Sequence, residues 1–310
     1  MTALTKSLTC LAAMLAVCDA DADELPAPKV CQLGQVVSLN VTTGAEGMIF
    51  VNGDVDGHKG DFLIDTGGMG LVLNFTTSTH LSNGPQRAFM SGQLVGGTTL
   101  DYGVFAKRLV IGGISSVNPW FLVAPDRILP SDAIGNIQPH ALWPYDVEID
   151  FWKGKLNLFL KNQCPGHVVY WTKEPYAAVP MVLDDAGHIT VRAVLDGKSV
   201  DALVDTGSQS SFISLRAASH ILDVDEDTKG MTSADPVFIN NAVHAKRYHY
   251  PFKSLTFEGI AIANPKIEIA DTGNDSRRDP LILGIGVLRQ LHLFVAYDES
   301  RLYLTLAEAK

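Results

Sequence analysis

Two aspartates occur in nearly the same setting and are the residues best placed to do chemistry. Phe62-Leu63-Ile64 runs into Asp65-Thr66-Gly67, and Ala202-Leu203-Val204 runs into Asp205-Thr206-Gly207, 140 residues later. A carboxylate at the end of an apolar strand is costly to bury alone. The Thr-Gly that follows supplies a hydroxyl and a tight turn whose N–H groups can reach the carboxylate. We therefore expect the rest of the chain to bring the two carboxylates together.

The elements that must position these aspartates form an internal duplication. At an offset of 140 residues, segment 48–57 aligns without a gap with 188–197, and both end in Asp-Gly, a hairpin signal. At an offset of 146, segment 107–119 aligns with 253–265, and 147–158 aligns with 293–304. The pattern predicts two similar lobes related by a pseudo-two-fold axis.

The segments are short, rich in β-branched residues and punctuated by Gly, Pro, Asn or Asp, which predicts a mainly β protein. Short helices are expected only at 215–221 and 287–291. The chain has 310 residues, of which 46% are hydrophobic, enough for one large domain or two smaller ones. Its formal net charge of −10 and the lack of a basic block argue against a nucleic-acid partner.

The N-terminus has the composition of a secretory signal peptide. Lys6 precedes the apolar run 8–17, and Ala20-Asp21-Ala22 is a small-x-small cleavage site, so we expect residues 1–22 to be a signal peptide and the protein to be exported, either periplasmic or secreted. The apolar run is too short to span a bilayer, and no stable membrane span is expected. A second interpretation uses Cys18 as a lipoprotein site, although Val17 is bulky for the preceding position.

Cleavage at this site leaves two cysteines, Cys31 and Cys164. An oxidising compartment favours a disulfide between them, and two buried free thiols are the alternative. The sequence has neither C-x-x-C nor H-E-x-x-H, so we expect no metal site and no cofactor. A third Asp-Thr-Gly, at Asp271, leads into the polar run 274–278 and is predicted to be a loop without a catalytic role.

As a pair in a duplicated frame, the first two Asp-Thr-Gly motifs resemble those of the pepsin and retropepsin aspartic proteases. The likeness extends to two apolar residues followed by glycine, and to the run after the second motif; the segments concerned are Ala133-Ile134-Gly135, Ile282-Leu283-Gly284 and Ser211-Phe212-Ile213-Ser214. The resemblance covers nearly all of the chain after the signal peptide. It is similar to compact, bacterial-type relatives, with lobes at 30–160 and 168–310 and a linker at 161–167.

The resemblance implies a bilobal acid-protease fold, with two pseudo-symmetric β-barrel-like lobes and an active-site cleft between them. It implies an aspartic endopeptidase, a monomer, that binds a peptide or protein substrate in extended conformation. Asp65 and Asp205 would share one proton and activate a water molecule. The residues that would support the two catalytic loops are Thr66, Gly67, Gly68, Thr206, Gly207 and Ser208, and Gly135 and Gly284 would be structural glycines.

The sequence departs from the family pattern at two places. Gly68 stands where pepsins usually carry Ser, which predicts one hydrogen bond fewer to Asp65 and a mildly acidic pH optimum. A clear flap tyrosine is missing: Tyr102 is a weak candidate, and segment 92–97 is the predicted flap. These departures keep open an alternative, a catalytically silent, secreted module that binds peptides or proteins with the same fold.

Overall fold

Strands dominate the residues that the computed structural model describes, which are 31–44, 47–93, 98–239, 243–271 and 279–307. Residues 32–310 form one unit by their contacts, and their described strands make two sheets. The predicted signal peptide, the alternative lipoprotein site at Cys18 and residues 94–97 of the predicted flap lie outside the described residues. The lobe boundaries at 160 and 168 stay predictions.

The first sheet contains ten strands from the first half of the chain. Its strands are β2 (Thr42–Thr43), β3 (Ile49–Val55), β4 (His58–Ile64), β5 (Val72–Asn74), β6 (Gln86–Gln93), β7 (Thr99–Phe105), β8 (Arg108–Ile111), β9 (Ile114–Val117), β10 (Trp120–Ala124) and β11 (Gly135–Ile137). Their order is β9-β8-β3-β4-β11-β5-β10-β7-β6, and β2 pairs with β3.

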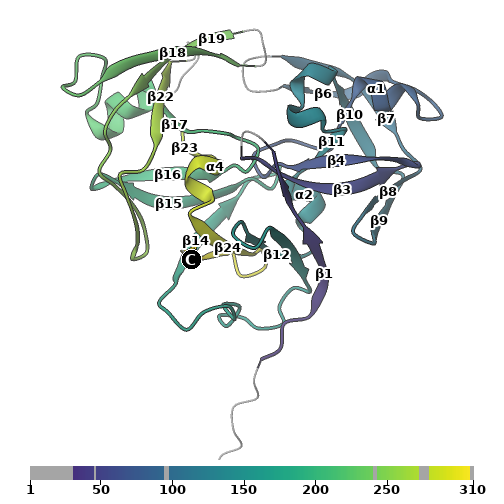
Figure 1. Cartoon of the computed structure of the whole chain (residues 1–310), viewed down its shortest axis with the longest axis horizontal. Coiled ribbons are helices and arrows are strands. Elements are labelled where there is room, and N and C mark those ends of the chain that lie inside the picture. The colour runs from purple at the N-terminus through teal and green to yellow at the C-terminus, as the bar shows by residue number, and fades with distance from the viewer. Residues whose placement is uncertain (1–30, 45–46, 94–97, 240–242, 272–278, 308–310) are drawn as a thin grey trace, which may run out of the picture. The chain divides into compact units, whose positions relative to one another are not determined.

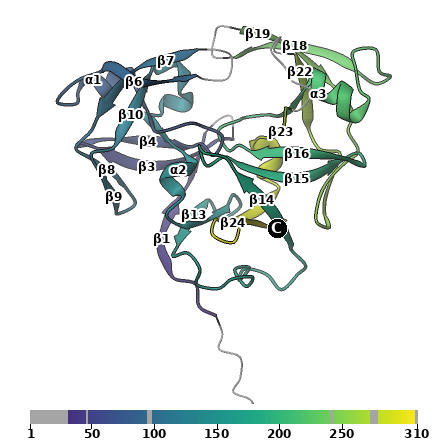
Figure 2. The same cartoon turned by 180° about the vertical axis from the view of Figure 1, so that it is seen from behind.

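The second half repeats this order strand for strand. Its strands are β15 (Ile189–Leu195), β16 (Lys198–Val204), β17 (Ser211–Ser214), β18 (Thr232–Ile239), β19 (Val243–His249), β20 (Ser254–Phe257), β21 (Ile260–Ala263), β22 (Ile267–Asp271) and β23 (Leu281–Leu283). They are arranged as β21-β20-β15-β16-β23-β17-β22-β19-β18, each strand number being twelve higher than its counterpart. The two lobes therefore share one topology, and Figures 1 and 2 both place the β6–β7 and β18–β19 hairpins at the same end of them.

A six-stranded layer joins the two halves. Its strands are β1 (Gln35–Asn40), β12 (Asp146–Asp150), β13 (Lys155–Phe159), β14 (Ala177–Leu183), β24 (Leu291–Ala296) and β25 (Arg301–Leu306). The order β1-β13-β12-β24-β25-β14 takes three strands from each half, and it continues through β14 and β15 into the second lobe. At its centre β12 and β24 run antiparallel with Val147 opposite Val295, as a pseudo-two-fold axis requires.

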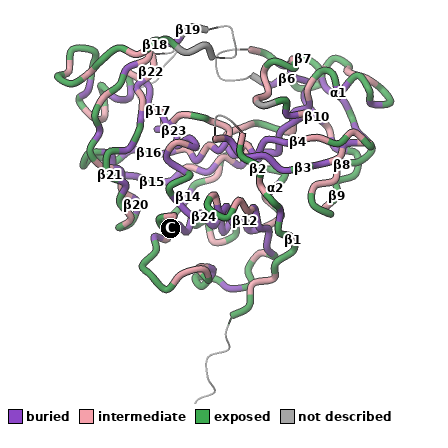
Figure 3. The backbone as a smooth tube through the Cα atoms, viewed as in Figure 1, coloured by how far each residue is buried: buried purple, intermediate pink, exposed green. Residues whose placement is uncertain are grey.

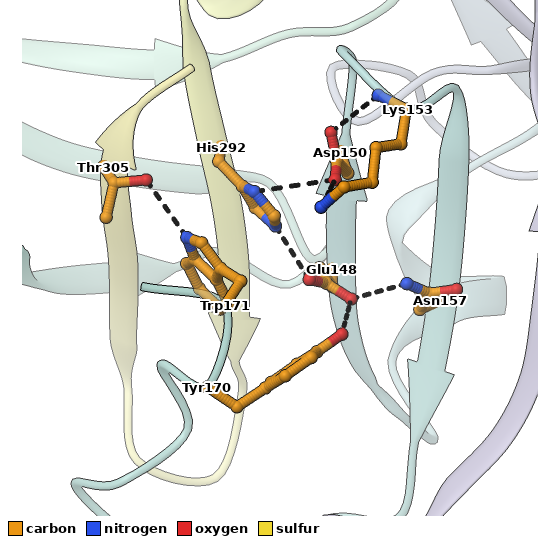
Figure 4. Close-up of polar contacts among 8 residues, drawn as sticks. All are labelled: Glu148, Asp150, Lys153, Asn157, Tyr170, Trp171, His292 and Thr305. Atoms are coloured by element: carbon orange, nitrogen blue, oxygen red, sulfur yellow. Dashed lines mark hydrogen bonds and ion pairs between the residues drawn. The ribbon is translucent and has the colours of Figure 1, made fainter. Parts of the chain in front are cut away.

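A buried polar cluster lies where β12 and β24 meet (Figure 4). Glu148 is 1% exposed and accepts hydrogen bonds from Nε2 of His292, the hydroxyl of Tyr170 and the amide of Asn157, at 2.7, 2.7 and 2.6 Å. The His292 ring stacks on Trp171 with centroids 4.1 Å apart. The cluster thus ties both halves of the central layer to the segment that leads into β14.

The described helices are short. They are α1 (Phe75–Thr79), η1 (Asp126–Ile128), η2 (Pro130–Asp132), α2 (Pro139–Leu142), α3 (Leu215–Ala217), the π-helical turn η3 (Ala218–Leu222) and α4 (Ile285–Leu288). The helix predicted at 215–221 is confirmed by α3 and η3. The helix predicted at 287–291 begins earlier, at Ile285, and its predicted end was wrong because Leu291 already opens β24.

The core follows the strands that lead to the two Asp-Thr-Gly motifs (Figure 3). Phe62 and Ile64 are fully buried before Asp65, and Ala202 and Val204 are at most 1% exposed before Asp205.

Cys31 and Cys164 are disulfide-bonded, which confirms the predicted pair. No helix in the described parts of the chain is both long and apolar enough to cross a membrane.

Candidate active site

The two aspartates follow directly on the central strands of their lobes. Each of these strands, β4 and β16, is paired in parallel with a short strand, β11 or β23. The amide of Asp65 donates to the carbonyl oxygen of Ile137 at 2.9 Å, and the amide of Asp205 donates to that of Leu283 at 3.0 Å. Both loops therefore leave their sheets in the same way and are held by equivalent backbone contacts.

The two threonines cross-connect the loops. The Thr66 hydroxyl donates to the Val204 carbonyl oxygen at 2.7 Å and accepts from the Thr206 amide at 3.0 Å. The Thr206 hydroxyl does the reverse, donating to the Ile64 carbonyl oxygen at 2.6 Å and accepting from the Thr66 amide at 3.1 Å. Both threonines are at most 2% exposed, so these four bonds are shielded from water.

The glycines of the motifs make room for the opposite carboxyl groups. A Cβ on Gly67 would lie 2.2 Å from Cγ of Asp205, and a Cβ on Gly207 would lie 2.6 Å from Cγ of Asp65. Real Cβ atoms do not come this close to other heavy atoms, so no other residue type fits at either position without a shift of the loops. Each carboxyl group therefore packs against the loop that carries the other.

The two carboxyl groups have different hydrogen-bond donors. The Asn136 amide donates to Oδ2 of Asp65 at 3.0 Å, and the Gly207 N–H donates to Oδ1 of Asp205 at 2.9 Å. Asn136 is itself fixed, because its Oδ1 accepts from the Val72 amide at 2.8 Å. Asn136 thus supplies a donor to Asp65 in the lobe where Gly68 lacks a hydroxyl.

Burial and the neighbouring carboxyl group together change the acidity of the pair. Burial first, then the charge of Asp205, raise the pKa of Asp65 to about 7, against the hydrogen bonds from Asn136 and Gly67. Burial also raises the pKa of Asp205, and backbone N–H groups and the charge of His188 oppose this rise. One proton is therefore retained by the pair in a pH range where an isolated aspartate has lost it.

The strand register corrects one predicted equivalence. Gly135 was matched with Gly284, but Gly135 lies opposite Phe62 on β4, whereas Leu281 lies opposite the matching residue Ala202 on β16. At the resulting offset of 146, Gly284 corresponds to Gln138. The error arose because Gly135 also follows two apolar residues, three positions too early.

This register explains why residue 68 is glycine. A Cβ on Gly68 would lie 2.5 Å from Nε2 of Gln138, whose side chain is buried beside Asp65. The second lobe has the opposite combination, because Ser208 carries the side chain and a Cβ on Gly284 would lie 2.6 Å from the Ser208 carbonyl oxygen. The departure from the family pattern at Gly68 is thus matched by a second substitution at Gln138.

Three neighbours of the aspartates were not predicted from the sequence: Asn136, Gln138 and His188. The first two stand beside Gly135, and the offset of 146 residues could have found them had it been applied to 281–284. His188 had no such signal, because it belongs to the loop between β14 and β15 of the other lobe. Its Nε2 lies 3.0 Å from the Gly68 carbonyl oxygen, and its Nδ1 lies 2.7 Å from Oδ2 of Asp184.

The predicted flap falls partly within the described residues. Gly92 belongs to β6, which pairs with β7 in a hairpin, and Tyr102 on β7 is 55% exposed opposite Arg87.

The third Asp-Thr-Gly triplet differs from its prediction as a loop, because Asp271 is the last residue of β22, while residues 272 and 273 lie outside the described residues. Asp271 also ends a strand, but β22 lies between β17 and β19 and not beside β23, so its setting differs from that of Asp205.

An apolar cavity of about 740 Å³ lies beside the first Asp-Thr-Gly loop. It is lined by residues of that loop, of the β6 end and of β10, among them Met69, Met90, Trp120 and Leu122. Gln138 also lines it, and its buried Oε1 has no hydrogen-bond partner within the described part of the chain. The cavity can therefore take apolar groups.

Comparison with known proteins adds a family and a fold. Residues 191–287 match the model of a family described as aspartyl protease. This part of the chain is therefore similar to aspartyl proteases. The aspartyl protease match begins in β15 and ends in α4, so it includes Asp205 and the second motif. No curated protein matches the sequence.

The crystal structure of basic 7S globulin from soybean is similar to this chain over 89% of its length and 96% of the globulin chain, with a TM-score of 0.50. The two sequences are 12% identical, so the likeness concerns the fold alone. The fold is the bilobal acid-protease fold, mainly β, as predicted. Among the described residues no group of His, Cys, Asp and Glu is arranged to hold a metal ion.

Proposed function

We propose that this protein is an aspartic endopeptidase that works in an oxidising compartment and uses Asp65 and Asp205 as its catalytic pair. The observation that carries the proposal is the reciprocal contact in which Gly67 and Gly207 make room for the opposite carboxyl groups. The family match of the second lobe supports the same activity. The disulfide state of Cys31 and Cys164 supports a location outside the cytoplasm.

The reaction follows from the single proton that the pair retains. The ionised carboxylate accepts a proton from a water molecule, whose oxygen attacks the carbonyl carbon of the peptide. The protonated carboxyl group donates its proton to the carbonyl oxygen, which gives a tetrahedral intermediate. As the C–N bond breaks, the leaving nitrogen takes the proton that the pair holds, and one hydroxyl of the intermediate gives its proton to the pair as the C=O bond re-forms, so the dyad returns to its singly protonated form. The Thr66 and Thr206 hydroxyls hold both loops in register throughout.

The apolar cavity supports a peptide with a large apolar side chain as the substrate. Met69 and Met90 line the cavity between the first motif and the β6 end, so a side chain bound there would lie beside Asp65. The proposal therefore includes a preference for apolar residues next to the cleaved bond.

Cleavage of a denatured protein by the purified chain, measured over a pH series, tests the proposal. We expect a bell-shaped profile, because only the singly protonated pair is active. A statine-type inhibitor, whose hydroxyl takes the place of the attacking water, should abolish cleavage, and a metal chelator should not. Asp65→Asn or Asp205→Asn should each lower kcat at least about 1,000-fold, the upper range for loss of general acid–base catalysis.

Asp271→Asn is the matched control, because it changes an aspartate of a third Asp-Thr-Gly triplet outside the proposed dyad. It should leave cleavage unchanged, and a loss as large as that of Asp205→Asn would contradict the choice of dyad. Binding of the inhibitor without any cleavage would instead identify a silent peptide-binding module. Cleavage that survives the inhibitor but stops with the chelator would overturn the mechanism.

A further inference from the structure

His188 is a largely buried histidine that reaches from the second lobe to the first Asp-Thr-Gly loop. Its side chain is 15% exposed. Nδ1 lies 2.7 Å from Oδ2 of Asp184, and Nε2 lies 3.0 Å from the carbonyl oxygen of Gly68. Its loop packs on the first lobe next to this contact, because a Cβ on Gly187 would lie 3.3 Å from Cβ of Pro139.

The two partners of the ring define its protonation. A backbone carbonyl oxygen can only accept, so Nε2 must carry a hydrogen towards Gly68. The Asp184 carboxylate also accepts, so Nδ1 must carry a hydrogen as well, and the ring with both hydrogens is an imidazolium. Burial raises the pKa of Asp184, but the hydrogen bonds from the His188 side chain and backbone outweigh this and lower it below its ordinary value. Asp184 is thus held as an anion, which balances the positive charge of the His188 imidazolium.

The duplicated frame shows that the fold itself does not need this histidine. The equivalent position in the first half, 140 residues earlier, is Met48. Met48 is 5% exposed and belongs to an apolar cluster with Ile285, the first residue of α4. One lobe therefore fills this position with an apolar contact, whereas the other supplies a charged group next to Gly68.

We propose that His188, held as an imidazolium between Asp184 and the Gly68 carbonyl oxygen, is a positioning residue that fixes the first Asp-Thr-Gly turn and favours the singly ionised state of the Asp65–Asp205 pair. The effect of His188 on catalysis rests on the proposed function, whereas its effect on the ionisation of the Asp65–Asp205 pair does not. Asp184 on the same loop is the charged group in contact with the ring, and the charge of His188 also acts on Asp65 and Asp205.

The sign of the effect follows from Coulomb's law. A cation near two carboxyl groups favours their ionised forms, and the charge of His188 lowers the pKa of both Asp65 and Asp205 against the larger rise from burial. The pair then loses its first proton at a lower pH, so the active form persists further into the acidic range. Asn136 and His188 thus oppose the effect of burial on Asp65, whereas the backbone N–H groups of the second loop and His188 oppose it on Asp205.

The test is a titration of the pair that does not depend on turnover. The carboxyl ¹³C signals of Asp65 and Asp205 are followed by NMR against pH in the full chain and in His188→Gln, His188→Lys and His220→Gln. His188→Gln should shift the first titration of the pair upward by about one pH unit, because the cation is gone. His188→Lys keeps a cation and should restore most of the wild-type curve, which a purely structural role would not predict. His220 is an exposed histidine on η3, and its variant should leave the curve unchanged.

Further readouts separate the possible failures. The imidazole ¹⁵N shifts of His188 should report two N–H groups, and Asp184→Asn, which keeps the ring, should move the titration of the pair in the same direction as His188→Gln. The acidic limb of kcat/KM should shift upward with the pair. Superimposed titrations of wild type and His188→Gln, or equal curves for the Gln and Lys variants, would overturn the inference. Absence of cleavage by the wild type at every pH would overturn the proposed function and leave this titration to decide the inference on its own.

Discussion

The two aspartates share a motif but not a set of neighbours. Asn136 donates to Asp65, and the residue at the same register position in the second lobe is Ile282, which has no donor. His188 approaches the first loop, whereas Met48 fills the equivalent place near the second. Substitutions within one duplicated frame thus make a symmetric pair of carboxyl groups chemically unequal. Their two titration steps belong to the pair as a whole.

At the residue scale, the raised pKa of Asp65 predicts a stability that falls with pH. Burial and Asp205 raise this pKa to about 7, whereas an aspartate in the unfolded chain titrates near about 4. Between these values the unfolded state releases a proton that the folded state keeps, so the free energy of unfolding decreases as pH rises. Asp65→Asn removes this loss and should be more stable than wild type by on the order of 1 kcal/mol at pH 8.

Urea denaturation of both proteins at pH 4 and pH 8 measures this difference. At pH 4 most of the gain should vanish, because the folded wild type holds the proton and the unfolded chain has released only about half of it. Asp227→Asn, which changes an exposed aspartate, is the control and should show no such change with pH. A variant that is less stable than wild type at pH 8 would contradict the prediction.

Local motifs predicted which residues form the candidate pair, but not which residues surround it. Both Asp-Thr-Gly runs follow apolar strands, and that pattern is visible in the sequence. Gln138 was missed because Gly135 offered a closer match to the expected pattern, and only strand pairing shows which residue lies opposite Phe62. His188 was missed because its contact with Gly68 spans 120 residues and joins two lobes.

At the element scale, paired hairpins carry the duplication. Asp56-Gly57 and Asp196-Gly197 both have positive φ angles, 50° and 90° in the first pair and 46° and 82° in the second, as a tight two-residue hairpin requires. The carboxylates of Asp56 and Asp196 each accept hydrogen bonds from two backbone N–H groups, at the start of β8 and of β20 respectively. These turns could be predicted because Asp-Gly is a strong local signal, whereas α1 and α2 are too short to show helical periodicity.

Loss of His292 from the central layer should strongly lower the free energy of unfolding. Its ring donates to Glu148 at 2.7 Å, and both side chains are at most 8% exposed. Burial, the hydrogen bond to Glu148 and its charge also raise the pKa of Tyr170, so Tyr170 stays a neutral donor to Glu148. His292→Leu removes one of the three donors and leaves a buried carboxylate poorly compensated, which should cost about 3–5 kcal/mol of unfolding free energy in urea denaturation.

The double variant Glu148→Gln with His292→Leu should recover much of this loss, since position 148 then carries no buried charge that lacks its partner. Lys153→Ala is the control, because the Lys153 side chain is 60% exposed in its ion pair with Asp150 and should contribute less than about 1 kcal/mol. A double variant that is as unstable as the single one would show that packing on Trp171, rather than the charge of Glu148, determines the cost.

At the scale of the whole molecule, three connections join the lobes near the candidate site. The central layer pairs β12 with β24, the threonine hydroxyls link the two Asp-Thr-Gly loops, and His188 contacts the Gly68 carbonyl oxygen. The central layer accounts for attachment of the lobes, but only the threonine bonds join one Asp-Thr-Gly loop directly to the other. Alignment of the two aspartates should therefore depend on Thr66 and Thr206 more than on the central layer.

Thr66→Val tests this alignment, because valine keeps the shape of threonine and removes the hydroxyl. The Val204 carbonyl oxygen and the Thr206 amide then lose their partners in a region that is at most 2% exposed. Each unsatisfied buried group costs about 1–3 kcal/mol, so the loss of two partners should lower the free energy of unfolding by about 2–6 kcal/mol. Turnover of a peptide substrate should fall more steeply than its KM changes, since the loop that carries Asp65 is no longer held against the other. Thr66→Ser retains the hydroxyl and should preserve most of both properties. A valine variant that is destabilised but keeps the wild-type kcat would show that the threonine bonds hold the lobes together without aligning the pair.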